Sequence, residues 1–295
     1  MKTNKTVGAL LIIAAGVLWG TMGLFVRYFN GIGLESLEIV SVRIIFTTLM
    51  LVPCVAIFKP SALKIKPRDI WCFVGTGVFS IVFFNICYFS TISTASLGTA
   101  AVLLYTAPIF VMLMAAVLFK EKLTPKKIIS CIAAFIGCMF VSGIVTGGLT
   151  LTPAAFLTGL GSGIGYALYS IFGRYAIMRG YDSLTITVYT FIFACVGILP
   201  LTDYPKAAAT MTTGVMPWIV AVLMGIVVSI MPYLLYTAGL SVTESGRASV
   251  MASVEPVTAA LVGMIVFGEI PGVSELLGII IILGSITALN IEFKE

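Results

Sequence analysis

Histidine is absent from this 295-residue chain, and charged residues make up only 10% of it. The absence of histidine excludes Ser-His-Asp triads, histidine metal ligands and imidazole proton shuttles. A soluble domain usually carries about 25% charged residues, so the scarcity of charge excludes a solvated globular surface. The net charge of +5 comes from basic residues dispersed over short segments, so no nucleic-acid partner is predicted.

Cysteine occurs six times, always inside an apolar run and never in a C-x-x-C spacing. Disulfides and zinc sites are therefore not expected, and we predict neither a metal nor a cofactor. Aspartyl chemistry needs two facing carboxylates, but Asp69, Asp182 and Asp203 fall at the ends of apolar runs or between them. A serine nucleophile without histidine would need a lysine deep in a run, and there is none. No catalytic residue is predicted, and an intramembrane enzyme is the least favoured function.

Long apolar runs are what the chain does have: 60% of its residues are hydrophobic and its mean hydropathy is +1.14. A hydrocarbon core about 30 Å thick requires about 20 apolar residues per helix. The first run is too long for a signal-peptide core of about 7–15 residues, so we interpret it as a retained span. This predicts an all-α membrane protein with ten transmembrane helices. The predicted spans are 7–28, 34–58, 70–92, 96–119, 126–146, 154–178, 184–202, 215–239, 246–268 and 273–291.

The positions of lysine and arginine predict the orientation of these spans. With the N-terminus inside, 14 of the 17 basic residues fall on the cytoplasmic side, only Arg27 and Lys206 fall on the other side, and Arg43 falls within a span. Cytoplasmic loops carry such an excess of positive charge. We therefore predict both termini in the cytoplasm, and a multi-pass protein of the bacterial cytoplasmic (inner) membrane.

The two halves of the chain match each other. One set of residues recurs 147 positions later: Gly16, Trp19, Phe25, Arg27 and Tyr28 as Gly163, Tyr166, Phe172, Arg174 and Tyr175. A second set recurs 148 positions later: Gly98, Ala100, Val102, Pro108, Phe119 and Glu121 as Gly246, Ala248, Val250, Pro256, Phe267 and Glu269. This predicts a duplication, with a first five-helix repeat at 1–148 and a second at 149–295. Five is an odd number, so the second repeat is predicted to be inverted, an arrangement found in many secondary transporters.

The same residues resemble the drug/metabolite transporter superfamily, EamA family, along the whole chain. The first half carries Leu18-Trp19-Gly20, Arg43, the run from Ala95 to Ala101, Pro108 and Lys120-Glu121; the second carries the run from Ser245 to Ser249, Glu255-Pro256 and Gly268-Glu269. The resemblance implies a ten-span fold with a central substrate cavity and the movement of small metabolites, often outward. The second half has Thr190 at the position of Arg43, so any recognition of a carboxylate by that arginine would be one-sided.

Glu255 lies within an apolar run, immediately before Pro256. A carboxylate at that depth costs roughly 2.5–3.5 kcal/mol and is tolerated mainly where it faces a bundle interior or a water-filled path. We predict that Glu255 is a protonatable or cation-binding group; the alternative is a structural ion pair, for instance with Arg43. Pro256 and its counterpart Pro108 are predicted helix kinks, which either expose carbonyl groups to a cavity or simply bend the bundle.

Arg43 offers a planar guanidinium that fits a carboxylate or phosphate, although it could also extend to the membrane surface or pair with Glu38. Aromatic residues near the middle of their spans could stack on an amphipathic or cationic substrate, or could pack the core. The predicted substrate-binding residues are Trp19, Arg43, Asn85, Tyr88, Tyr105, Tyr166, Tyr236 and Glu255. Glu121 and Glu269 end their spans at opposite faces and are predicted to be gate contacts or helix-end anchors.

These features predict a secondary transporter that works by alternating access in the lipid bilayer. The chain has no Walker motif, so nucleotide hydrolysis does not supply its energy. An arginine and a glutamate together suit a zwitterion, which favours export of amino acids or similar metabolites, with protons as a candidate coupling ion. A passive channel, or a facilitator for organic cations or drug-like compounds, stays open as the alternative.

Overall fold

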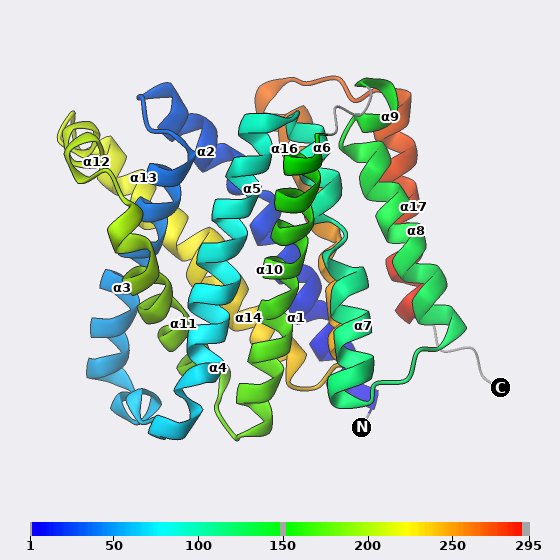
Figure 1. The fold of residues 1–295 in the computed structure, drawn as a ribbon, viewed down its shortest axis with the longest axis horizontal. Helices are drawn as coiled ribbons and strands as arrows, with labels where there is room; N and C mark the ends of the chain where they lie inside the picture. The colour runs from blue at the N-terminus through cyan, green and yellow to red at the C-terminus, as the bar shows by residue number, and fades with distance from the viewer. Residues whose placement is uncertain (1, 148–151, 291–295) are drawn as a thin grey trace.

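A computed structural model describes residues 2–147 and 152–290, and within these ranges every regular element is a helix (Figure 1). The predicted all-α fold is confirmed for this part of the chain. In the first half, the helices are α1 Lys2–Gly20, α2 Met22–Gly31, α3 Ser36–Phe58, η1 Pro60–Leu63, η2 Pro67–Asp69, α4 Ile70–Val74, η3 Gly75–Val82, α5 Phe83–Thr94, α6 Leu97–Leu104, α7 Ala107–Phe119, α8 Pro125–Val141 and α9 Ile144–Gly147. In the second half, they are α10 Pro153–Met178, α11 Ser183–Ile198, η4 Leu199–Leu201, α12 Tyr204–Met211, α13 Met216–Met224, η5 Gly225–Ile230, α14 Met231–Leu240, α15 Ser245–Ala252, α16 Val254–Phe267 and α17 Val273–Asn290.

Nine helical segments in the described ranges are long and apolar enough to cross a membrane. They correspond to nine of the ten predicted spans. The remaining span, predicted at 126–146, corresponds to α8, which has 17 residues and ends before a turn at Ser142 and Gly143. A helix of that length lies at the lower limit of about 17–25 residues for a membrane span, so the tenth crossing and the orientation of the chain stay predictions.

Several spans consist of more than one helix. The first span, predicted as one segment, is interrupted at Thr21, whose hydroxyl donates a hydrogen bond to the Leu18 carbonyl oxygen at 2.7 Å. The third and the eighth predicted spans each contain a π-helical stretch, η3 and η5. Because π-helical turns widen a helix locally, their occurrence at equivalent places in the two halves is a structural trace of the duplication.

Each half also packs its first helix against the other half in the same way. A Cβ on Gly16 of α1 would lie 2.9 Å from the Ala252 carbonyl oxygen, and a Cβ on Gly163 of α10 would lie 2.9 Å from the Leu103 carbonyl oxygen. Gly16 and Gly163 are counterparts in the sequence repeat, and the contacted backbones are the ends of α15 and α6. Glycine is therefore required at both positions, because the helices approach too closely for any side chain.

The helices form one bundle in which α8 and α17 lie side by side at one end, and α12 and α13 lie at the other (Figure 1). Helix α8 contacts α17 through Gly137 and Gly278, each of which has no room for a Cβ beside the other's carbonyl oxygen. The start of α1 and the end of α17 lie at the lower edge of the bundle in Figure 1. Helix α7 ends at this lower edge, whereas its repeat counterpart α16 ends at the upper edge. The predicted boundary between repeats, at 148 and 149, lies outside the described residues.

Candidate functional site

Two interruptions of membrane helices, at equivalent places in the two halves, position the centre of the candidate site. Helix α6 ends at Leu104 and α7 begins at Ala107, while α15 ends at Ala252 and α16 begins at Val254. The predicted kinks at Pro108 and Pro256 are thus places where one helix ends and another begins, with the proline in the first turn of the new helix. Proline is tolerated there because its missing N–H would have no partner inside the helix.

Glu255 lies in the first turn of α16, so its carboxylate is next to the positive end of a helix dipole. The side chain is half-buried. The Tyr166 hydroxyl, from α10, donates a hydrogen bond to Glu255 at 3.0 Å. Electrostatic interactions also connect Glu255 with Tyr88 and Tyr105, and both of these side chains are half-buried. Glu255 therefore binds one tyrosine hydroxyl directly and interacts at longer range with two more tyrosines, and the three come from different spans.

Arg43 of α3 has only 7% of its surface exposed, and its Nε is buried without a hydrogen-bond partner. Within the described residues, the Arg43 guanidinium takes part in no ion pair and no hydrogen bond, although the Arg43 carbonyl oxygen accepts one from the Thr47 hydroxyl at 2.6 Å. The proposed pairing with Glu38 does not form, because Glu38 accepts a hydrogen bond from the Glu35 backbone N–H and lies 3.8 Å from Lys206. Arg43 does interact with Glu255 electrostatically, beyond ion-pair distance.

An aromatic cluster lies beside these two charges. The Trp19 ring centroid is 6.3 Å from that of Tyr166, 5.3 Å from that of Tyr233 and 5.4 Å from that of Tyr236. The Tyr236 hydroxyl shares a 2.7 Å hydrogen bond with Ser170, and the residue is only 3% exposed. Tyr236 is therefore buried and hydrogen-bonded within the bundle, whereas Trp19 and Tyr166 are half-buried.

Asn85 is the predicted site residue that the structure does not join to the others. Its side-chain amide donates a hydrogen bond to the Ile81 carbonyl oxygen at 2.7 Å, and 3% of its surface is exposed. One N–H of the amide therefore binds one turn back on its own helix. This hydrogen bond uses one of the two N–H groups of the amide, so the role of Asn85 in substrate binding stays a prediction.

Glu121 follows α7 and connects the two halves at the lower edge. Its two carboxylate oxygens accept hydrogen bonds from the backbone N–H groups of Ser245, at 2.7 Å, and of Gly246, at 3.2 Å. Arg174 donates hydrogen bonds to the carbonyl oxygens of Leu240, at 2.8 Å, and of Thr243, at 3.3 Å. The connection between α14 and α15 is therefore held on both sides by charged groups from other helices.

Glu269, the repeat counterpart of Glu121, has a different partner at the upper edge. It forms an ion pair with Arg27, the counterpart of Arg174, and the Arg27 guanidinium lies 4.0 Å from the centre of the Phe267 ring. Both side chains of the pair are about half exposed, at 51% and 52%. Glu269 does not bind the backbone at Leu97 and Gly98, the positions equivalent to Ser245 and Gly246.

Arg27 and Arg174 were not among the predicted site residues, and neither was Tyr233, which contacts Trp19 and interacts electrostatically with Arg43. The sequence did contain a signal for the two arginines, since each occupies the same place in its repeat near the end of a span. Tyr233 has no such signal, because its position in the cluster results from the packing of α14 against α1.

Comparison with known proteins gives one family model, the EamA-like transporter family, which matches residues 6–143 and 153–291. An "uncharacterized transporter" of Archaeoglobus fulgidus is 28% identical over 285 residues, which cover 95% of this chain and 94% of that protein. "Uncharacterized transporter YxxF" of Bacillus subtilis is 27% identical over 95% of this chain and 88% of its own length. "Uncharacterized inner membrane transporter YicL" of Salmonella typhimurium is 21% identical over 98% of this chain and 96% of its own. A crystal structure that covers 97% of this chain and 96% of its own shares the fold, with a TM-score of 0.77 and 17% identity.

Proposed function

Since the chain belongs to the EamA-like transporter family, we propose that it is a secondary transporter that moves a small zwitterionic metabolite by alternating access. The substrate class that we propose is an amino acid or a similar compound with one cationic and one anionic group. The direction that we propose is export across the bacterial inner membrane. A carrier explains why both halves have an interrupted helix at the same place and why charged residues lie within the spans. An intramembrane enzyme would not require this symmetry between the halves.

The observation that carries the proposal is the unpaired guanidinium of Arg43. An isolated buried charge is strongly unfavourable, and removing one partner of a buried pair costs about 3–5 kcal/mol. Arg43 has no such partner in the described protein, although Glu255 is close enough to interact with it. A substrate carboxylate between the two would pair with Arg43 through a bidentate contact, and the substrate ammonium group would face Glu255.

The aromatic cluster supports the same orientation of the substrate. Trp19 and Tyr166 are half-buried and lie next to Glu255, where their ring faces would attract an ammonium group. The Tyr166 hydroxyl already donates to the carboxylate, so it can maintain that hydrogen bond while the other carboxylate oxygen binds the substrate. Protons are the coupling ion that we propose, since Glu255 can carry one when no cationic group is bound.

We further propose that the repeats are inverted and that their equivalent ends serve as alternating gates. The support is that α7 and α16 end at opposite edges of the bundle (Figure 1), with Glu121 and Glu269 in equivalent places. In this structure the lower edge would be the closed gate, because Glu121 and Arg174 bind the connection between α14 and α15. In the alternate state, Glu269 would bind the N–H groups of Leu97 and Gly98, and Arg27 would leave Glu269.

The test is counterflow in vesicles that contain the purified protein, with labelled amino acids, organic cations and quaternary amines as candidates. Arg43→Gln removes the charge but keeps hydrogen-bonding groups, and it is expected to weaken amino-acid transport about 10- to 100-fold, the loss typical of a charge-assisted hydrogen bond. Glu255→Gln is expected to abolish the response of transport to a pH gradient. Arg68→Ala, which removes an exposed cation near the lower edge, is the matched control and should transport like the parent.

Several results would contradict the proposal. Unchanged transport in Arg43→Gln, with organic cations as the preferred substrates, would favour a facilitator for cations, which the carboxylate and the aromatic cluster would suit. Flux that neither saturates nor shows counterflow would indicate a channel. A parent-like response of Glu255→Gln to a pH gradient would exclude proton coupling through this residue.

A further inference from the structure

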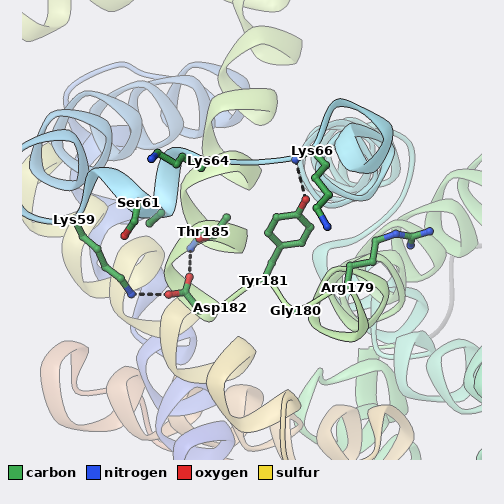
Figure 2. Close-up of a pocket in the computed structure, with 10 residues that line it drawn as sticks. Lys59, Ser61, Lys64, Lys66, Arg179, Gly180, Tyr181, Asp182 and Thr185 are labelled. Carbon is green, nitrogen blue, oxygen red and sulfur yellow. Dashed lines mark hydrogen bonds and ion pairs between the residues drawn. The ribbon is translucent and has the colours of Figure 1, made fainter.

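A pocket of about 370 Å³ lies at the lower edge of the bundle, away from Glu255. One side is the segment between α3 and η2, which carries Lys59, Lys64 and Lys66; the other is the turn between α10 and α11, from Arg179 to Thr185. Figure 2 shows these two segments facing each other across the pocket, with the Lys59–Asp182 pair at one side. The first repeat and the second therefore each contribute one wall.

Two of the pocket's four cations already have carboxylate partners. Lys59 forms an ion pair with Asp182 at 2.5 Å. Arg179 binds Asp69 through its Nε at 2.8 Å, and the Tyr181 hydroxyl donates a hydrogen bond to the same carboxylate at 2.8 Å. These contacts hold the two walls of the pocket together, and the carboxylates of Asp182 and Asp69 are both paired with a cation.

The ammonium groups of Lys64 and Lys66 have no such partners in the described chain, and neither does the Ser61 hydroxyl. All three line the pocket. The pocket therefore keeps an excess of two positive charges together with hydrogen-bond donors, which is the chemistry that recognises a phosphate group. Lysines that only set the orientation of the protein in the membrane need not line a common pocket.

Exposed apolar side chains lie directly beside these basic residues in the chain. Phe58 precedes Lys59 and is 81% exposed, and Met178 precedes Arg179 and is 65% exposed. Trp71 is 40% exposed, and the centre of its ring lies 4.9 Å from the guanidinium carbon of Arg179. Aromatic and basic residues in this combination are typical of the boundary between lipid chains and head groups. A ligand at this pocket therefore meets both positive charge and lipid-facing surface.

We propose that this pocket binds the head-group phosphate of an anionic phospholipid from the leaflet at the lower edge. The phosphate contacts Lys64, Lys66 and Ser61, and the acyl chains lie along the surface at Phe58 and Met178. Basic pockets between membrane helices recognise anionic lipids in this way. Since the walls come from the two repeats, the bound lipid links the repeats at a place separate from the gates.

The experiment compares retention of phosphatidylglycerol and phosphatidylcholine by native mass spectrometry, with thermal unfolding in nanodiscs of each lipid as a second measurement. Lys64→Ala/Lys66→Ala removes the two unpaired cations. Because each lysine contributes about 1 kcal/mol to binding an anionic surface, the double variant should bind phosphatidylglycerol about 30-fold more weakly. Arg68→Ala/Lys122→Ala removes two exposed cations that do not line the pocket and should bind like the parent.

Both substituted lysines are exposed, so the variant is expected to fold, and its unfolding in phosphatidylcholine should match that of the parent. Equal losses of phosphatidylglycerol in the two double variants would overturn the proposal, since general surface charge would then explain the binding. Equal stabilisation of the parent by inorganic phosphate would also overturn it, because the ligand would then be a free anion.

Discussion

The two edges of the bundle contain the same residues in different arrangements. At the lower edge, Glu121 binds the first backbone N–H groups of α15, and Arg174 binds the carbonyl oxygens of Leu240 and Thr243 at and after the end of α14. At the upper edge, their counterparts Glu269 and Arg27 bind each other and are half exposed. Ser245, at the start of α15, is completely buried, whereas its counterpart Leu97, at the start of α6, is 64% exposed. Equivalent sequences can therefore be packed and paired differently in the two halves of one molecule.

The largest effect is expected from removing the charge of Glu121. A hydrogen bond to a charged group contributes about 1.5–3 kcal/mol, so Glu121→Gln should raise the rate of hydrogen exchange about 10-fold or more at Ser245 and Gly246. Glu269→Gln removes only an exposed ion pair, which contributes about 0.2–1 kcal/mol, and should change exchange at Leu97 and Gly98 little. Hydrogen–deuterium exchange of the segments 243–250 and 95–102 measures both. Equal changes at the two edges would show that the lower contacts do not hold a closed gate.

A second comparison uses the glycines in the first turns of α6 and α15. A Cβ on Gly98 would lie 2.7 Å from the Ser142 carbonyl oxygen, whereas a Cβ on Gly246 would lie 3.4 Å from Met112. Overpacking against backbone typically costs about 1–3 kcal/mol, so Gly98→Ala should lower the unfolding temperature. In Gly246→Ala the new methyl group makes ordinary van der Waals contacts, and alanine stabilises a helix by up to about 1 kcal/mol relative to glycine. Thermal unfolding of both variants should therefore separate them, and the opposite order would contradict the packing at the upper edge.

The smallest effect concerns pH and the ion pair that joins the repeats at the lower edge. Burial alone would raise the pKa of Asp182, but hydrogen bonds from Lys59 and from the Thr185 backbone outweigh it and lower the pKa. The folded pKa is therefore below the unfolded value of about 3.9, so this contribution is present above that pH and is lost as the pH falls through the folded pKa. The unfolding temperature of the parent should fall more steeply below about pH 4 than that of Asp182→Asn.

Asparagine is the matched control for this measurement, because it keeps the side-chain acceptor that caps α11 at Thr185 but cannot ionise. The difference between the two curves isolates the carboxylate of Asp182 from other titrating groups. Parallel curves throughout the acidic range would show that the Lys59–Asp182 pair contributes nothing to stability.

Much of the fold could be predicted from the sequence because lipid imposes simple rules. Apolar runs of membrane length predicted the helices, and the shared offset of residues such as Gly16 and Gly163 predicted a duplication, but not the equivalent packing contacts that these two glycines make. The proline positions predicted interruptions in two spans but not that each interruption would end a helix. The break at Thr21 was missed although Gly20 precedes it, because glycine is frequent inside membrane helices and does not by itself indicate where one ends.

The candidate site was predicted in its composition and not in its pairings. Glu255 and Arg43 were recognisable because a charge inside an apolar run is costly. Whether they pair directly could not be predicted, since the distance between them depends on how α3 and α16 pack. Asn85 was grouped with the substrate residues, and the sequence did not predict that its amide N–H would donate to the Ile81 carbonyl oxygen on its own helix.

The sequence by itself determined that the chain is a helical membrane protein, that it was built by duplication, and which few residues carry charge into the apolar region. The lengths of the apolar runs and the spacing of the repeats follow directly from the order of residues, so they need no tertiary information. Only the tertiary structure decided that Glu121 binds a helix N-terminus while Glu269 binds an arginine, and that the Arg43 guanidinium has no partner among the described residues. These differences arise between residues far apart in the chain, where packing alone determines which groups meet.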